Sequence, residues 1–247
     1  MPQDQVEVTG MVLFSIPIGD YDKRISILTK EMGLVQAFVR GAKRPNSRFS
    51  AACDPMCFGS FLIYPGRSAW NLASVNIRNY FEKVKGDLEA VYYASYFLEL
   101  AAYFARENLD ASDQLNLLYI SLSALTDGRF PGRLVRVVYE LKTFVINGIY
   151  PDVFSCASCG CREGLAYLSP ERGTIRCRDC GPEGGEVELL PSALYAMQYI
   201  IQKPVGKLYT FTVKEEVLEN LEQVMKRLVG RYCDRPLKTA SFLDGLP

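Results

Sequence analysis

Residues 24–39 read RISILTKEMGLVQAFV, and this stretch decides the fold of the N-terminal part of the chain. Polar and apolar side chains alternate along residues 24–29, which is typical of a strand with one buried face. Residues 30–33 contain Gly33 and read as a turn, and residues 34–39 return as a second apolar strand. The stretch therefore predicts a β-hairpin.

Further strands are predicted on both sides of this hairpin. Residues 6–18 are rich in Val, Ile, Leu and Phe, and residues 57–64 and 70–80 flank a turn at Pro65-Gly66. The intervening residues 41–54 are polar and basic, so we expect a loop there. Five short strands in succession predict a small closed barrel, and the OB-fold is the five-stranded candidate. We assign residues 1–80 to this domain.

Helical periodicity replaces strand alternation after Tyr80. Helices are predicted over residues 82–106, 112–126, 132–147 and 192–202, followed by a last helix. Ser112 is a candidate N-cap, and Thr212-x-x-Glu215 has the pattern of a capping box before the last helix. The pattern predicts an α+β multidomain protein: an N-terminal OB-fold barrel (1–80), then a helical domain (81–247) that carries a cysteine-rich insertion at residues 153–188.

The insertion contains two Cys-x-x-Cys pairs, Cys156/Cys159 and Cys177/Cys180, separated by 17 residues. This spacing is typical of a four-cysteine zinc site. Because each pair presents two sulfurs, two pairs complete a tetrahedron with no open position, and the site would be structural. A redox dithiol or unpaired buried thiols are the alternatives.

Four further cysteines have no such pattern. Cys161 is a spare that could replace Cys159, although its spacing is less suitable. Cys53, Cys57 and Cys233 are expected to pack in the core, since free cysteine is among the most buried residue types.

The chain contains 247 residues and no histidine. A Ser-His-Asp triad, a Cys-His dyad and a His-ligated catalytic zinc all need an imidazole, so these sites are excluded. Phosphate-binding and dinucleotide-binding glycine motifs are also absent. We therefore expect a protein that is not an enzyme, and any metal site must use thiolates or carboxylates.

A net charge of zero hides a strongly basic segment. Within residues 23–48, seven basic side chains face a single acidic one, Glu31. The basic residues are Lys23, Arg24, Lys30, Arg40, Lys43, Arg44 and Arg48. On a barrel, cations that follow phosphates and aromatic faces that stack on bases favour single-stranded nucleic acid. A solvated loop is the alternative for the charges. The candidate stacking residues are Phe49, Tyr64, Trp70 and Tyr80, for which core packing is favoured.

The N-terminus has no basic, apolar leader, and no apolar stretch is long enough to span a bilayer. We therefore expect no membrane association and a location in a reducing compartment.

Several strings in the chain resemble the RecO family of bacterial recombination mediators. These are Val39-Arg40-Gly41-Ala42-Lys43-Arg44, the run from Tyr139-Glu140-Leu141-Lys142 through Asn147-Gly148-Ile149-Tyr150-Pro151 into the first cysteine pair, and Arg235-Pro236-Leu237-Lys238. They occur in the family's order and span nearly the whole chain.

The resemblance implies a mediator in the bacterial cytoplasm, associated with the nucleoid. It would bind single- and double-stranded DNA, anneal complementary strands, and act with RecR to help load RecA onto DNA coated by single-strand-binding protein. It implies one structural Zn²⁺ on Cys156, Cys159, Cys177 and Cys180. DNA contact is implied at Arg40, Lys43 and Arg44, and charge alone extends it to Lys23, Arg24 and Arg48.

The resemblance also implies that the helical domain binds the acidic, apolar tail of single-strand-binding protein. Arg133 and Arg136 are candidates for that contact, with an ordinary solvated helix face as the alternative. Two other functions stay open: a metal-dependent phosphodiesterase that uses carboxylates, and a zinc-containing scaffold that binds proteins without DNA.

Overall fold

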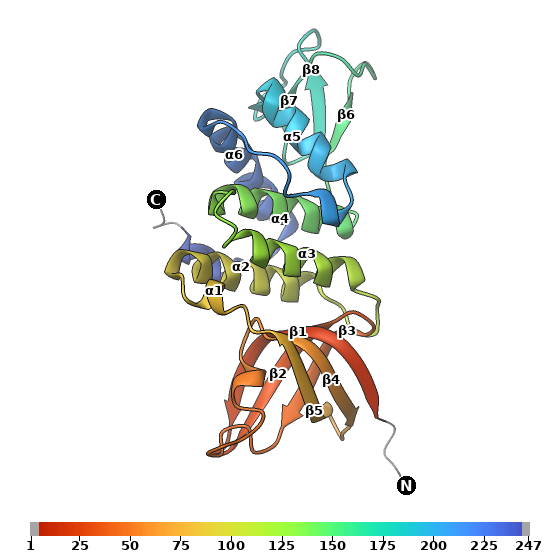
Figure 1. Ribbon diagram of the computed structural model, residues 1–247. Coiled ribbons are helices and arrows are strands. Elements are labelled where there is room, and N and C mark those ends of the chain that lie inside the picture. The colour runs from red at the N-terminus through yellow and green to blue at the C-terminus, as the bar shows by residue number, and fades with distance from the viewer. Residues whose placement is uncertain (1–4, 244–247) are drawn as a thin grey trace. The chain divides into compact units, whose positions relative to one another are not determined.

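The computed structural model describes residues 5–243, which fall into two compact units that divide between Thr126 and Asp127. The first unit contains all five strands predicted for the barrel. The strands are β1 (Val6–Ile18), β2 (Asp22–Thr29), β3 (Gly33–Val39), β4 (Phe58–Pro65) and β5 (Trp70–Asn79). They close in the order β1-β2-β3-β5-β4, which confirms the OB-like barrel (Figure 1).

Alternation along the strands builds the core of the barrel. Ile25 and Ile27 on β2 point inward and are fully buried, as are Ala37 and Val39 on β3. The residues between them face outward, and Arg24 pairs with Phe38 across the two strands. The hairpin thus presents one apolar face to the core and one mixed face to the outside.

The closure between β3 and β5 is short. Only two parallel pairs join these strands, Ala37 with Trp70 and Phe38 with Asn71. The start of β3 pairs instead with a loop after the helices: Gly33 bridges to Glu107, and the Leu34 amide donates to the Arg106 carbonyl at 3.0 Å. Between these two contacts the barrel wall has a seam that no strand fills.

Three helices complete the first unit: α1 (Glu82–Lys85), α2 (Leu88–Phe104) and α3 (Ser112–Ala124), with α2 packed on β1 and α3 on β2 (Figure 1). The prediction of one helix over residues 82–106 is wrong, because the chain breaks at Gly86 and restarts where the Asp87 carboxylate accepts a hydrogen bond from the Ala90 amide at 3.0 Å. Ser112 is the first residue of α3 and not its cap; the Asp110 carboxylate accepts from the Ser112 amide at 3.2 Å.

The second unit combines three helices with a small sheet. The helices are α4 (Gly132–Ile146), α5 (Pro191–Gln202) and α6 (Glu215–Tyr232), and the strands are β6 (Asp152–Cys156), β7 (Leu165–Ser169), β8 (Thr174–Cys177) and β9 (Val187–Glu188). The sheet order is β6-β8-β7-β9. The apolar stretch Leu165–Leu168 predicts one strand within the cysteine-rich insertion, and it lies in β7; the sequence pattern did not predict the other three strands. The prediction of a capping box at Thr212 and Glu215 is also wrong, because Lys214 is the N-cap residue of α6 and its side chain makes no capping hydrogen bond.

The predicted domains are residues 1–80 and 81–247, and their outer limits lie outside the described residues. The boundary between them at residue 80 stays a prediction. None of the helices within residues 5–243 is both long and apolar enough to cross a membrane.

Lys142 on α4 is buried, although its side chain carries a charge. Its Nζ donates to the carbonyl oxygens of Ile200 and Ile201, both at 3.1 Å, and of Lys203 at 2.6 Å. These carbonyls belong to the C-terminal end of α5, where helical partners run out and the dipole favours a cation. Lys142 thus fixes the end of α5 against α4.

Replacing Lys142 with Met should lower the free energy of unfolding by about 2–3 kcal/mol, because buried carbonyls would lose their donor. Urea denaturation followed by circular dichroism measures the change. Lys226→Met is the matched control, since Lys226 is exposed on α6. Equal stability of the two variants would contradict this role for Lys142.

Candidate functional site

The two cysteine pairs lie in tight turns at the ends of neighbouring strands. Cys156 ends β6 and Cys177 ends β8, and these strands run parallel in the sheet. The Gly160 amide donates to the Cys156 carbonyl at 2.9 Å, and the Gly181 amide donates to the Cys177 carbonyl at 3.2 Å. Both glycines have positive φ, +75° and +67°, which closes each turn behind its second cysteine.

Four sulfurs lie within 4.8 Å of one another, those of Cys156, Cys159, Cys161 and Cys177. Three of them are predicted ligands, and Cys161 is the spare. Sulfurs bound to zinc at about 2.3 Å in a tetrahedron are about 3.8 Å apart. The Cys159 and Cys177 sulfurs lie 3.8 Å apart, so the cluster is compatible with zinc without rearrangement of this pair.

Cys180, the fourth predicted ligand, is not one of these four sulfurs, although the Cys159 and Cys177 side chains influence its thiol. The Ser158 hydroxyl lowers the pKa of its thiol, but contacts with the Cys159 and Cys177 side chains outweigh this effect and raise the pKa to about 12. Cys161 thus occupies the place among the four grouped sulfurs that the spacing predicted for Cys180. The Cys161 thiol donates to the Glu163 carbonyl at 3.4 Å.

Backbone amides prepare two of these sulfurs for ionisation. The amides of Cys159 and Cys177 lower the pKa of the Cys156 thiol to about 5, and the Cys177 amide nitrogen lies 3.4 Å from the Cys156 sulfur. The Cys180 amide lowers the pKa of Cys177 in the same way. Each turn thus supplies one thiol that readily becomes the thiolate that a metal ion requires.

The cysteines outside the two Cys-x-x-Cys turns, Cys53, Cys57 and Cys233, are buried. Cys53 and Cys57 belong to the core of the barrel, where burial raises the pKa of the Cys53 thiol to about 12. Burial also raises the pKa of Cys233, to about 11. These thiols resist ionisation, as packing residues do.

Most of the basic residues predicted to bind DNA already contact the protein. Lys23 forms an ion pair with Asp54 at 3.1 Å. Arg48 donates to the Ala73 carbonyl at 2.8 Å, and its guanidinium lies 4.7 Å from the centre of the Phe49 ring.

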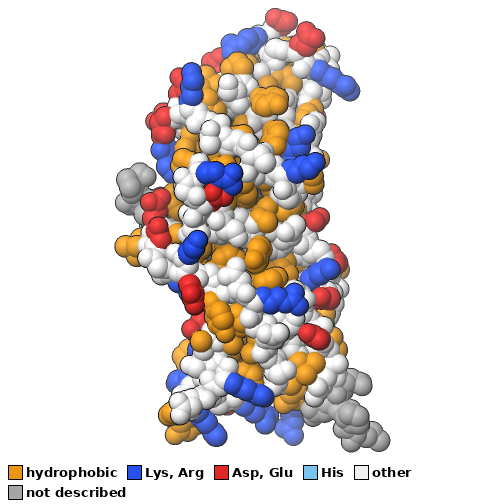
Figure 2. Space-filling view, viewed as in Figure 1, with side chains coloured by type: hydrophobic (Ala, Val, Ile, Leu, Met, Phe, Trp, Pro, Cys, Tyr) orange, Lys and Arg blue, Asp and Glu red, His pale blue; other side chains and the backbone are white. Residues whose placement is uncertain are grey.

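Lys43 and Arg44, in the loop after β3, make weaker contacts with the rest of the barrel. Lys43 reaches the Gly19 carbonyl at 3.3 Å, and the Arg44 guanidinium lies 5.4 Å from the centre of the Tyr21 ring. Both side chains remain exposed. Figure 2 shows Lys and Arg side chains gathered on the barrel at the end away from α2 and α3.

Arg24 and Arg40 are exposed on the outer face of the β2–β3 hairpin, and Arg67 is exposed on the β4–β5 turn. None of the three forms an ion pair or side-chain hydrogen bond with another part of residues 5–243. The sequence pattern did not predict a DNA contact at Arg67, because Arg67 is a single cation in a turn, outside the basic segment 23–48. The folded barrel places Arg40 and Arg67 on one cavity of about 660 Å³.

Arg133 and Arg136, the candidate partner contacts, are both ion-paired on α4. The Arg133 Nε donates to Glu222 at 3.1 Å, and its terminal nitrogen bonds to Glu215. The Arg136 Nε donates to the buried Glu140 at 3.1 Å. An acidic partner would have to compete with carboxylates that these side chains already hold.

A groove of about 440 Å³ lies on the same unit, beside α5 and α6. Exposed Tyr195 and the ring of Phe211 line it together with Lys214. It joins an apolar surface to a cation and to the carboxylate of Glu216.

Comparison with known families covers both units. The model described as Recombination protein O N terminal matches residues 1–81, and the one described as Recombination protein O C terminal matches residues 85–241. A DNA repair protein RecO from Symbiobacterium thermophilum is 30% identical over 97% of this chain and 96% of its own length.

Two further relatives have the same name. The protein from Acetivibrio thermocellus is 28% identical over 98% of this chain and 97% of its own length, and the one from Bacillus subtilis is 26% identical over 95% and 92%. Matches of this extent leave no part of the barrel, the helices or the cysteine module outside the family. The chain therefore belongs to the RecO family of DNA repair proteins.

Proposed function

We propose that this protein is a DNA-binding mediator that anneals complementary strands without chemical turnover. It would bind single- and double-stranded DNA on the barrel and, with RecR, help load RecA onto DNA coated by single-strand-binding protein. The observation that carries the proposal is the set of exposed arginines on the barrel, Arg24, Arg40 and Arg67, which have no ion pair within residues 5–243, in a chain of the RecO family. Neutralised phosphates lower the repulsion between two strands that approach each other.

The cysteine cluster would hold one zinc ion as a structural element. Cys156, Cys159 and Cys177 supply three sulfurs, and either Cys180 or Cys161 supplies the fourth. With four thiolates the ion has no open position, so its role would be to fix the two turns and the sheet between α4 and α5.

The acidic, apolar tail of single-strand-binding protein would bind in the groove beside α5 and α6. Tyr195 offers apolar surface and Lys214 a cation. Arg133 and Arg136 stay predictions for the same contact.

A strand-annealing assay tests the proposal directly. Complementary oligonucleotides, each coated with single-strand-binding protein, should pair several-fold faster when the protein is added than when it is omitted. The same mixture with Mg²⁺ should show intact strands. Cleavage products would support the phosphodiesterase alternative, and a protein that binds no DNA at any salt concentration would support the scaffold alternative.

A further inference from the structure

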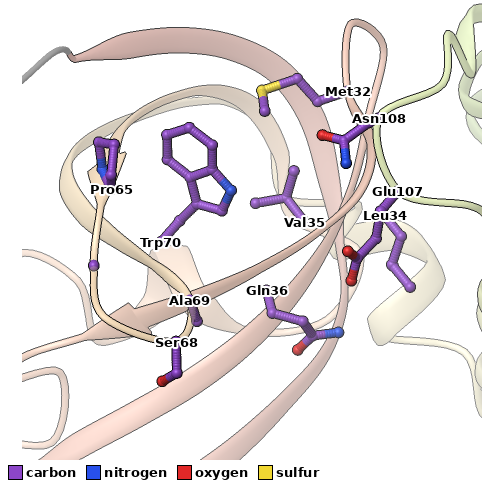
Figure 3. Close-up of a pocket in the computed structure, with 11 residues that line it drawn as sticks. Met32, Leu34, Val35, Gln36, Pro65, Ser68, Ala69, Trp70, Glu107 and Asn108 are labelled. Carbon is purple, nitrogen blue, oxygen red and sulfur yellow. The ribbon is translucent and has the colours of Figure 1, made fainter.

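The seam between β3 and β5 opens into a cavity of about 300 Å³ (Figure 3). Its apolar wall includes Met32, Val35 and the half-buried ring of Trp70. Its polar rim includes Gln36, Glu107 and Asn108. The volume is at the small end for ligand pockets, which suits one flat ring better than a larger molecule.

Several backbone contacts hold the rim in place. The Asn108 amide donates to the Met32 carbonyl at 2.9 Å, and the Ala111 amide donates to the Lys30 carbonyl at 3.0 Å. The loop that carries Glu107 and Asn108 is therefore attached to the β2–β3 turn at several points. The amide and carboxylate groups of the rim can donate to and accept from the edge of a base.

Trp70 is suited to stacking. Figure 3 shows its indole directed into the space that the Met32 side chain also faces. The indole N–H makes no hydrogen bond to any group within residues 5–243. A ligand in the cavity would meet both an aromatic ring and a free donor.

A second cavity lies on the other side of the β4–β5 turn. Pro65, Gly66, Ser68 and Ala69 line both cavities. The second one also contains Arg40 and Arg67, and its one carboxylate, that of Asp22, accepts a hydrogen bond from the Gly41 amide at 2.8 Å. The turn thus borders a cavity that contains the Trp70 indole and a cavity that contains two cations, which Phe38 and Tyr64 also line.

A glycine lies in the turn that lines both cavities. A Cβ on Gly66 would lie 2.3 Å from the Ala69 carbonyl oxygen and 2.6 Å from the Asn71 side-chain nitrogen. Only glycine fits there without a shift of the turn.

We propose that the seam cavity takes an unpaired base of single-stranded DNA, stacked on Trp70, while the adjoining phosphate lies against Arg40 and Arg67. The inference rests on the proposed DNA binding and names a site for it. An aromatic face beside two neighbouring cations is the combination that binding of single-stranded DNA requires. A duplex cannot offer an unstacked base to the seam, so this site would favour single strands.

Trp70 is the only tryptophan in the chain, so its emission reports on this site alone. Titration of the full-length protein with an unlabelled thymidine oligonucleotide should quench the emission, at the same concentrations at which a labelled strand gains fluorescence anisotropy. An abasic strand of equal length should raise the anisotropy with far less quenching, because it brings phosphates but no rings.

Two variants separate stacking from folding. Trp70→Ala should weaken binding of the thymidine strand by about 5- to 150-fold, the range for loss of one stacked base. Trp70→Phe retains an aromatic ring and should recover most of the affinity. Circular dichroism must show that each variant is folded. If a variant fails to fold, the quenching of the unmodified protein still tests the site.

The outcomes are distinct. Binding by anisotropy with unchanged tryptophan emission overturns the seam site and leaves the proposed function standing. Equal quenching by abasic and thymidine strands also overturns it. Absence of DNA binding in both measurements overturns the proposed function and the seam site together.

Discussion

Replacement of Cys156 or Cys177 with serine should remove the metal from the purified protein and destabilise its second unit. Both residues are buried, both end a strand of the small sheet, and both are the thiols that backbone amides prepare for ionisation. Structural zinc sites contribute apparent binding free energies of about 10–16 kcal/mol to folding. Loss of the site should therefore exceed the effect of any single packing change in this unit.

Metal analysis of the purified chain, followed by thermal unfolding, measures both effects. The unmodified protein should contain about one zinc ion per chain. Each variant should contain far less and should melt at a lower temperature. Cys233→Ser is the matched control, because Cys233 is buried in the same unit but lies outside the cluster. Unmodified protein that purifies without metal, or a control that loses as much metal, would contradict the prediction.

The same series identifies the fourth ligand. If Cys180 completes the tetrahedron, Cys180→Ser should lower the zinc content and Cys161→Ser should leave it unchanged. The opposite result would assign the ligand to Cys161, whose sulfur lies within 4.8 Å of the other three. Retention of metal in both single variants, with loss in the double variant, would show that the two thiols substitute for each other.

The strands of the barrel could be predicted because each has one face in the core. Every second residue of β3 is buried, and Ile25 and Ile27 of β2 are buried on either side of half-buried Ser26, which leaves the alternation that the sequence displays. The strands of the cysteine module could not be predicted in this way. β9 has two residues and β8 has four, and their positions depend on turns and thiols more than on apolar alternation.

The candidate site was predicted in part for a similar reason. Cysteine spacing is local, so it pointed to the cluster, although it did not distinguish Cys161 from Cys180. Ion pairs join distant residues: Lys23 meets Asp54, 31 residues away, and Arg133 meets Glu222, 89 residues away. No local pattern shows which cations such partners will occupy. The seam cavity depends on how β3 meets β5, which only the closed barrel determines.

The paired Arg24→Ala and Arg40→Ala substitutions should weaken single-strand binding by at least roughly tenfold at low salt and make it less sensitive to salt. Both side chains are exposed and have no ion pair or side-chain hydrogen bond within residues 5–243, so a bound phosphate would meet their whole charge. For single strands the logarithm of the affinity falls with the logarithm of salt concentration by about 0.7 per phosphate contact. Loss of two contacts should reduce that slope by about 1.4.

Fluorescence anisotropy of a labelled oligonucleotide across a salt series measures the slope. Lys23→Ala with Arg48→Ala is a matched control that removes the same charge. Lys23 is already paired with Asp54, and the Arg48 guanidinium donates to the Ala73 carbonyl. The control should change the slope little, whereas Lys43→Ala with Arg44→Ala should flatten it, since that loop stays exposed.

This comparison separates local contact from overall charge. If DNA responded only to net charge, every double variant would lose the same affinity and slope, because each removes two positive charges from a chain whose net charge is zero. A graded result follows only if phosphates meet particular side chains on the outer face of the hairpin and its loop. Equal slopes for all three variants would therefore contradict a defined DNA path over the barrel, even if DNA binding itself were intact.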